Sequence, residues 1–276
     1  IEKTKPEKII TSNHFSSVLK LLTAKNNIKI ETHLRSNHEF LVPWNQFLMR
    51  FNIGKIPISI SISRVTYDKI RNFLESIIGK TFGLWLNIKD RKKMILFIEF
   101  DPSQYSDLIH NIDKNGDKPL FVNRRRPAIW NFKSISILRK NRCKIASPLQ
   151  FLTRGEKKQA EILSLNICQK LEKIWSTEAE FLSSFFSIEN FTFWPSISEV
   201  LLKIYKNRML EYILLVKFSK KLFEKIDFRS VVSLNTMGET EKTILNTNTN
   251  KISAVLLEHG ASDYLPEISR YDVTSG

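Results

Sequence analysis

This sequence has little cysteine and lacks the glycine-rich motifs that bind phosphate. The two cysteines, Cys143 and Cys168, are 25 residues apart and form no CxxC pair. A disulfide framework and a zinc finger are therefore not predicted, and both thiols fit a reducing compartment. Neither GxGxxG nor GxxxxGK[ST] occurs, so the two commonest phosphate-loop fingerprints are absent.

Long apolar runs and metal-type histidine spacings are also missing. The best apolar candidate, Tyr212–Phe218, is interrupted by Lys217 and is far shorter than the roughly 18–20 residues of a membrane span. The histidines show no HxH or HExxH spacing, so no metal site is predicted, and no cofactor is expected. No signal peptide is evident. The chain begins at Ile1 and not at methionine, so we expect it to be a fragment.

Basic residues are abundant. Lys and Arg number 43 against 28 acidic residues, which gives a net charge of +15. This excess favours polyanionic partners, namely nucleic acid, phosphorylated ligands or an anionic membrane surface, and does not choose among them. With 276 residues, 42% of them hydrophobic, the chain can bury a substantial core, and general disorder is excluded.

From Met94 onward, short apolar runs alternate with helical patterns. Met94–Phe100 has the length and composition of a strand covered on both faces, and Pro119–Asn123 and Cys143–Ser147 are predicted as the next strands. Helical spacing over Tyr105–Asn115 and Ile129–Lys140 separates them. Strands that alternate with helices in this way predict a parallel sheet.

A long helical segment, about residues 155–228, interrupts this alternation. The α/β pattern then returns with a strand at Ser230–Leu234, a helix at Glu239–Asn246 and a strand at Ser253–Leu257. The sequence therefore predicts an α/β fold, a Rossmann-like parallel sheet with a large helical insertion, in a domain that spans residues 91–276.

Residues 1–90 form an amino-terminal α/β extension to which no role is assigned. The isoleucines of Ile56–Ile62 alternate with serines, which predicts a strand with one wet face at a sheet edge. The predicted elements are a helix at His14–Ala24, a strand at Ile28–Leu34, a helix at Trp44–Phe51, a strand at Ile58–Ser63 and a helix at Thr66–Ile78.

Polar residues follow the predicted strands, where open parallel sheets bind their ligands. The cations of Arg124, Arg125 and Arg126 and the helix start at Gly238 suit a phosphorylated or nucleotide-linked ligand, although an arginine run is also typical of a solvated loop. His259 and Gly260 end the last strand, where the imidazole is either a catalytic base or a structural cap. Asp101 is predicted as a helix N-cap and not as a catalytic acid.

Two stretches resemble a known enzyme family. Ser230–Val-Val-Ser-Leu-Asn-Thr-Met-Gly238, the helix after it, and Ser253–Ala-Val-Leu-Leu-Glu-His-Gly260 resemble the end of the amino-terminal domain in GT-B type glycosyltransferases. Members of this family that build capsule and lipopolysaccharide have a strand ending in His-Gly before the chain crosses to the donor domain. The stretch Ile95–Ser147, with Val122–Asn-Arg-Arg-Arg-Pro-Ala-Ile-Trp130, is similar to the earlier part of the same domain.

The resemblance implies a function. The chain would be the amino-terminal half of a GT-B architecture, in an enzyme that transfers a sugar or polyol phosphate from a nucleotide-activated donor to a glycan or lipid-linked acceptor. His259 and Gly260 would face the interdomain cleft, with His259 as the base. The carboxyl-terminal donor domain would be absent, so the fragment alone is expected to be inactive. The implied location is the cytoplasm, at the inner face of the membrane.

Two other functions remain open from the sequence. The first is a basic nucleic-acid-binding module, although no RRM, OB, KH or helix-turn-helix signature is present. The second is a module that docks on anionic membranes without catalysis. Its basis is an apolar stripe between Trp194 and Phe228 that is accompanied by the basic residues Lys203, Lys206, Arg208, Lys217, Lys220, Lys221 and Lys225.

Overall fold

The structure is a computed structural model. It describes residues 6–11, 19–20, 23, 28–32, 46–53, 56–87, 93–125, 127–188, 191–248 and 252–257. The chain divides into two compact units, which are described separately below: Ile1–Asp68 with Glu161–Leu210, and Lys69–Ala160 with Glu211–Gly276.

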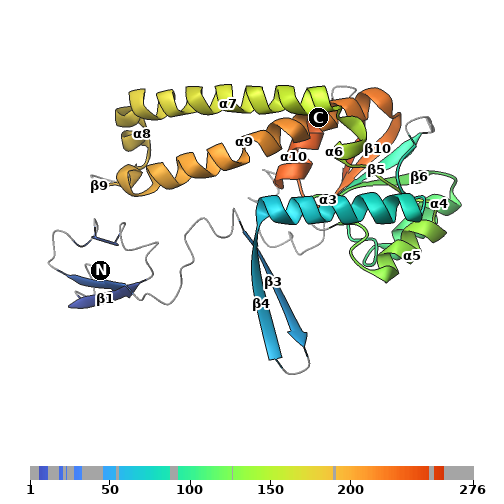
Figure 1. The fold of residues 1–276 in the computed structure, drawn as a ribbon, viewed down its shortest axis with the longest axis horizontal. Coiled ribbons are helices and arrows are strands. Elements are labelled where there is room, and N and C mark those ends of the chain that lie inside the picture. The colour runs from blue at the N-terminus through green and yellow to red at the C-terminus, as the bar shows by residue number, and fades with distance from the viewer. Residues whose placement is uncertain are drawn as a thin grey trace. The chain divides into compact units, whose positions relative to one another are not determined.

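The second unit is built on a five-stranded parallel sheet (Figure 1). Its strands are β5 (Met94–Ile98), β6 (Lys118–Val122), β7 (Lys144–Ile145), β10 (Phe228–Ser233) and β11 (Ala254–Leu256). They lie side by side in the order β11-β10-β5-β6-β7. Counted along the chain this is the 3-2-1-4-5 order of doubly wound nucleotide-binding folds, in which the winding reverses beside the first strand. The predicted α/β fold with a parallel sheet is thus confirmed.

Helices cover both faces of this sheet. The short ones are α4 (Ser106–Lys114), α5 (Phe132–Lys140), α6 (Pro148–Phe151) and α10 (Glu239–Asn246). Three long helices, α3 (Arg64–Thr81), α7 (Arg154–Thr177) and α9 (Trp194–Lys225), each continue from one unit into the other. Side-chain caps fix several starts: Asn131, for example, accepts the N–H of Ser134 at 2.7 Å at the beginning of α5.

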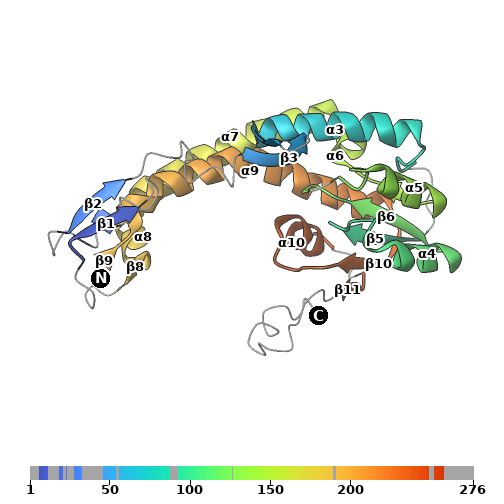
Figure 2. The same ribbon diagram turned by 90° about the horizontal axis from the view of Figure 1, so that it is seen from below.

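The core of the second unit has two halves, one on each face of the sheet. All five residues of β5 are buried, and because successive strand residues point to opposite faces, they divide between the halves. Met94, Leu96 and Ile98 pack in the half with side chains of α9 and α10, whereas Ile95 and Phe97 pack in the half with side chains of α4 and α5. Figure 2 shows α4 and α5 together beside the strands.

The first unit contains small sheets and a helical pair. β1 (Lys8–Thr11) pairs in parallel with β2 (Lys29–Thr32), and β3 (Gln46–Ile53) forms an antiparallel pair with β4 (Ile56–Ser63). Between α7 and α9 lie α8 (Ala179–Phe185) and the short pair β8 (Ser187–Ile188) and β9 (Phe191–Thr192). Trp175 joins α7 to α9, since its indole N–H donates to the carbonyl of Ser198 at 3.0 Å and its ring contacts Trp194.

Two local predictions are wrong. The predicted helix Trp44–Phe51 is strand β3 over its described residues, because the chain there pairs along its length with β4. Asp101 does not cap α4: its carboxylate accepts the N–H of Ser103 at 2.9 Å in a turn, and the N-cap of α4 is Tyr105. Most of the predicted helix His14–Ala24 lies outside the described residues.

Candidate functional site

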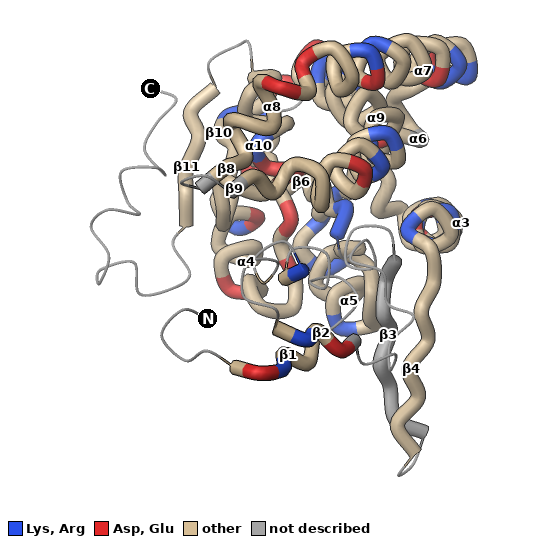
Figure 3. Tube along the Cα trace, turned by 90° about the vertical axis from the view of Figure 1, so that its left-hand side faces the viewer, with Lys and Arg blue, Asp and Glu red and all other residues tan. Residues whose placement is uncertain are grey.

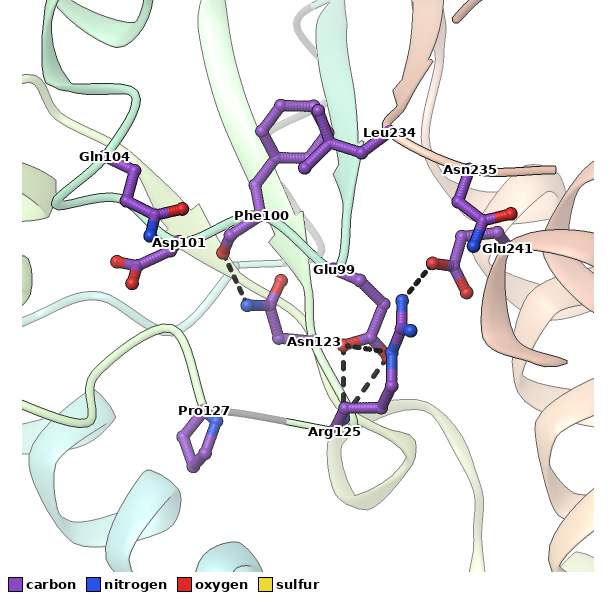
Figure 4. Close-up of a pocket in the computed structure, with 10 residues that line it drawn as sticks. All are labelled: Glu99, Phe100, Asp101, Gln104, Asn123, Arg125, Pro127, Leu234, Asn235 and Glu241. Carbon is purple, nitrogen blue, oxygen red and sulfur yellow. Dashed lines mark hydrogen bonds and ion pairs between the residues drawn. The ribbon is translucent and has the colours of Figure 1, made fainter. Parts of the chain in front are cut away.

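A cavity of about 340 Å³ opens at the carboxyl edge of the sheet, where the winding reverses between β5 and β10. Its volume is in the range of small-molecule sites. The lining comes from the segments after β5, β6 and β10 and from α10 (Figure 4). The lining residues are Glu99, Phe100, Asp101, Gln104, Asn123, Arg125, Pro127, Leu234, Asn235 and Glu241. Ligands of doubly wound folds bind at this place, so the cavity, here called the crevice, is the candidate site.

Glu99 shapes the floor of the crevice. It follows the last residue of β5 directly and has φ of 60°, in the left-handed region that non-glycine residues rarely adopt. Its buried carboxylate accepts the backbone N–H of Arg124 at 2.9 Å and that of Arg125 at 3.1 Å. The strained backbone is thus held by charge-assisted bonds that fix the loop after β6.

Arg125 connects two buried carboxylates across the crevice (Figure 4). Its Nε lies 3.7 Å from Oε2 of Glu99, and its terminal nitrogen forms an ion pair with Oε1 of Glu241. Both carboxyl side chains are almost fully buried, at 4% and 1% exposure, while Arg125 itself is 56% exposed. One guanidinium therefore offsets the charge of two carboxylates that are buried away from bulk water.

Burial raises the pKa of Glu241 above its usual value, and the nearby Glu99 raises it further, while Arg125 and the backbone N–H of Glu241 oppose the shift. In the described part of the chain, Oε2 of this carboxylate accepts no hydrogen bond. Gly238 makes room for it, because a Cβ at this position would lie 2.2 Å from Oε2. A bulkier residue than glycine would therefore displace the carboxylate.

Amide side chains complete the rim. Asn123 donates to the carbonyl of Phe100 at 2.6 Å, which ties the segment after β6 to the segment after β5. Asn235 accepts the N–H groups of Met237 at 2.6 Å and Gly238 at 3.3 Å and so shapes the entry into α10. These contacts leave hydrogen-bonding groups of both kinds at the wall of the crevice.

The structure describes three of the six predicted site residues. Arg125 lines the crevice, and Gly238 is the N-cap of α10 beside it. The side chain of Arg124 is 9% exposed, and its guanidinium forms ion pairs with Glu211 and, at 3.6 Å, with Glu239. Arg126, His259 and Gly260 lie outside the described residues. That any of the six binds a ligand stays a prediction.

Sequence reasoning missed the two carboxylates that hold Arg125. The predicted strand Met94–Phe100 includes Glu99, whereas β5 ends at Ile98 and Glu99 begins the loop. Glu241 belongs to the predicted helix Glu239–Asn246, in which the sequence gives it no role in the site. Residues that follow a parallel strand line the ligand site of such a sheet. A predicted strand that ended at Ile98 instead of Phe100 would therefore have indicated Glu99 as a site residue.

No protein-family model, curated protein or solved structure matches this chain. The chemistry of the crevice and the sequence resemblance are therefore what a functional proposal has to build on. Within the described residues, no group of three or more His, Cys, Asp or Glu side chains is placed to hold a metal ion. Nor does any described helix combine the length and apolarity that crossing a bilayer takes.

Proposed function

We propose that this chain is the acceptor-binding domain of a GT-B type glycosyltransferase of cell-surface polysaccharide assembly. The main support is the crevice at the point where the winding of the sheet reverses, lined by carboxylates and amides. The resemblance of Ser230–Gly260 to the end of such a domain is the second support. The nucleotide-activated donor would bind to a second domain outside this sequence.

The lining of the crevice favours hydroxyl groups over phosphate. Three carboxylates, those of Glu99, Asp101 and Glu241, face a single guanidinium, that of Arg125, so the local charge is negative when all are ionised. Sugar hydroxyls donate to carboxylates and accept from amides, which is the chemistry that Asp101 and Asn235 offer at the rim. A phosphorylated group would meet net repulsion here.

The loop after β5 argues against binding of a dinucleotide in the usual mode. That mode needs glycines between the first strand and its helix, so that the pyrophosphate can approach the backbone. Here the corresponding residues are Glu99–Ser103, with no glycine, and α4 starts only at Ser106. An acceptor sugar, which is bound by side chains, does not need this close approach.

In this proposal the chemistry is displacement at the anomeric carbon of the donor. An acceptor hydroxyl attacks that carbon, a base takes the hydroxyl proton, and the nucleoside diphosphate leaves. The crevice residues orient the acceptor, and His259 is the proposed base. An enzyme that uses lipid-linked acceptors would work in the cytoplasm at the inner face of the membrane.

Saturation-transfer NMR with the 276-residue chain tests sugar binding. Neutral mono- and disaccharides should receive saturation, and the same sugars carrying a phosphate should receive less. Asp101→Asn keeps the oxygen that accepts the N–H of Ser103 but removes the negative charge, and should weaken the sugar signal. Asp107→Asn, the same change at an exposed position of α4, is the matched control and should leave it unchanged.

The outcomes separate the candidates. No saturation of any sugar, or an equal signal in both variants, overturns the proposed acceptor site. Saturation of oligonucleotides in preference to sugars would favour the nucleic-acid-binding alternative.

A further inference from the structure

Helix α3 is turned so that its polar side faces the protein. Its buried residues include Arg71 and Glu75, each 7% exposed. Four large apolar residues lie on its exposed side: Ile70 at 48%, Phe73 at 64%, Leu74 at 47% and Ile77 at 47% exposure. Their spacing of i, i+3, i+4 and i+7 places them on one face of the helix, here called the α3 stripe. A surface helix normally has the opposite orientation.

Specific contacts hold α3 in this orientation. Arg71 donates from one terminal nitrogen to the carbonyl of Arg124, in the loop after β6, and from the other to Asn72 at 3.1 Å. Gly79 lies against the ring of Trp85, where a Cβ would come within 2.1 Å of a ring carbon. Rotation of α3 to bury the stripe would break both contacts, so the stripe stays on the surface.

The charges beside the stripe are all positive. On the exposed positions of α3 the charged residues are Lys69 and Lys80, while its two acids, Asp68 and Glu75, are half-buried and buried. Lysine side chains can lie along an apolar surface and extend their ammonium groups to phosphates beyond it. Apolar residues with flanking cations are typical of helices that lie at a membrane surface.

We propose that the α3 stripe, with Lys69 and Lys80, is a docking surface for anionic lipid. The four apolar side chains would enter the boundary between headgroups and acyl chains, and the two ammonium groups would contact lipid phosphates. This inference does not depend on the crevice binding sugar. The stripe covers about two helical turns, or roughly 10 Å, so binding is weak and reversible.

A second copy of the chain fits the stripe less well. At roughly 200 Å² for each whole side chain, half exposure leaves about 400 Å² on the stripe, against roughly 800 Å² per partner in a stable protein interface. Antiparallel pairing of two α3 helices would also bring Lys69 of one copy toward Lys80 of the other. The small apolar area and the repulsion between these lysines both favour a negatively charged surface over self-association.

The lysines of α9 lack such an apolar partner face. In the carboxyl-terminal half of α9, Phe218 and Leu222 are 0% exposed and belong to the core of the second unit. Lys220 and Lys225 are exposed without a neighbouring apolar stripe on that half of the helix. Figure 3 shows that positive and negative residues also alternate along α7. The inference therefore rests on α3, and the membrane-docking surface that the sequence predicts on 194–228 stays a prediction.

Vesicle sedimentation with the 276-residue chain tests the proposal. The chain should sediment with vesicles that contain phosphatidylglycerol and remain in solution with phosphatidylcholine alone, and added salt should weaken the binding. Phe73→Ser combined with Leu74→Ser should reduce partitioning by roughly tenfold to a hundredfold, since both side chains lose their apolar surface. Phe132→Ser is the matched control, because Phe132 is 88% exposed but has no place in the stripe.

A charge series locates the cations. Lys69→Gln with Lys80→Gln should weaken vesicle binding, and Lys220→Gln with Lys225→Gln, which removes the same charge from α9, should not. Light scattering on the same samples measures self-association. The proposal would be overturned if both lysine-pair variants lost vesicle binding equally, or if the unmodified chain did not bind vesicles at low salt. It would also be overturned if the chain formed a dimer that only the Phe73→Ser/Leu74→Ser variant abolished, and this result would assign the stripe to a second copy.

Discussion

Glu99 holds Arg125 at two points: its carboxylate accepts the backbone N–H of Arg125 at 3.1 Å, and its Oε2 lies 3.7 Å from the guanidinium Nε. The first contact fixes the course of the loop after β6, and the second fixes where the cation lies in the crevice. The positive φ of Glu99 directs its side chain to this loop and away from the strand that it follows.

Replacing Glu99 by Gln should destabilise the second unit. A carboxylate that accepts two backbone N–H groups becomes a neutral amide that has one acceptor oxygen and two N–H donors without a suitable partner. We expect a loss of roughly 1–3 kcal/mol in the free energy of unfolding. Urea denaturation measures it. Glu224→Gln, an exposed position on α9, is the control and should stay within roughly 0.5 kcal/mol.

Gly238→Ala should be costly, and a second glycine offers a direct comparison. The new Cβ would meet Oε2 of Glu241 at 2.2 Å, and overpacking of this kind costs roughly 1–3 kcal/mol. At Gly155, near the start of α7, a Cβ meets nothing within 4 Å, so Gly155→Ala should stabilise by roughly 0.4–1 kcal/mol.

A double-variant cycle shows whether the clash is the cause. Glu241→Ala removes the carboxylate that Gly238 accommodates, so Gly238→Ala should cost much less in that background. The coupling between these contacting residues should reach roughly 0.5–3 kcal/mol. An equal cost of Gly238→Ala in both backgrounds would show that the backbone at Gly238, and not the carboxylate, requires glycine.

The sheet could be predicted from sequence because each strand has a local signal. Met94–Phe97 is an unbroken apolar run, and the turn at Asn235–Gly238 and the acids that follow it predict the start of α10. The segment 44–51 has no such signal: its apolar residues fit helical spacing about as well as alternation, and its pairing with Ile56–Ser63 decides for a strand. Strand pairing of this kind is a property of two segments together.

The crevice was harder to predict, because its ion pairs join residues that are far apart in sequence. Arg124 is 87 residues from Glu211, and Arg125 is 116 residues from Glu241. From the sequence alone, the arginine run predicts cations that are available to bind phosphate. The fold brings distant carboxylates to these arginines, and the ion pairs between them could not be predicted. The outward face of α3 was missed for a similar reason, since the contact of Arg71 with the loop after β6 spans 53 residues.

If the proposed glycosyltransferase function holds and His259 is its general base, His259→Ala in the intact protein should lower turnover by roughly 10²–10⁴-fold, with little change in folding stability. Steady-state kinetics with a thermal melt separates the two effects. His110→Ala is the control: His110 makes a 3.1 Å contact with Asn141, does not line the crevice and should keep full turnover. Unfolding of the His259→Ala variant, with full activity in any folded remainder, would assign His259 a structural role.

Arg125→Ala removes the cation between Glu99 and Glu241. Both carboxylates stay buried and repel each other, so the folded state should lose roughly 1–3 kcal/mol at neutral pH, a range reduced from that of fully buried pairs because Arg125 is 56% exposed. Without the guanidinium, which lowers the pKa of Glu241, burial raises the folded-state pKa of Glu241 further above its usual value. The folded variant then binds more protons than the unfolded chain above about pH 4.5, so its stability falls as the pH rises.

The deficit relative to the unmodified chain should therefore be small near pH 4 and grow toward pH 7, which urea denaturation across this range measures. Glu241→Gln in the Arg125→Ala background removes one of the two repelling charges and should recover part of the loss at pH 7 and little at pH 4. Arg142→Ala is the control, because Arg142 pairs with Asp113 at 2.9 Å while 65% exposed and should cost less than about 1 kcal/mol. A deficit that is constant with pH would mean that Arg125 acts by packing, and the crevice carboxylates would then not be coupled through it.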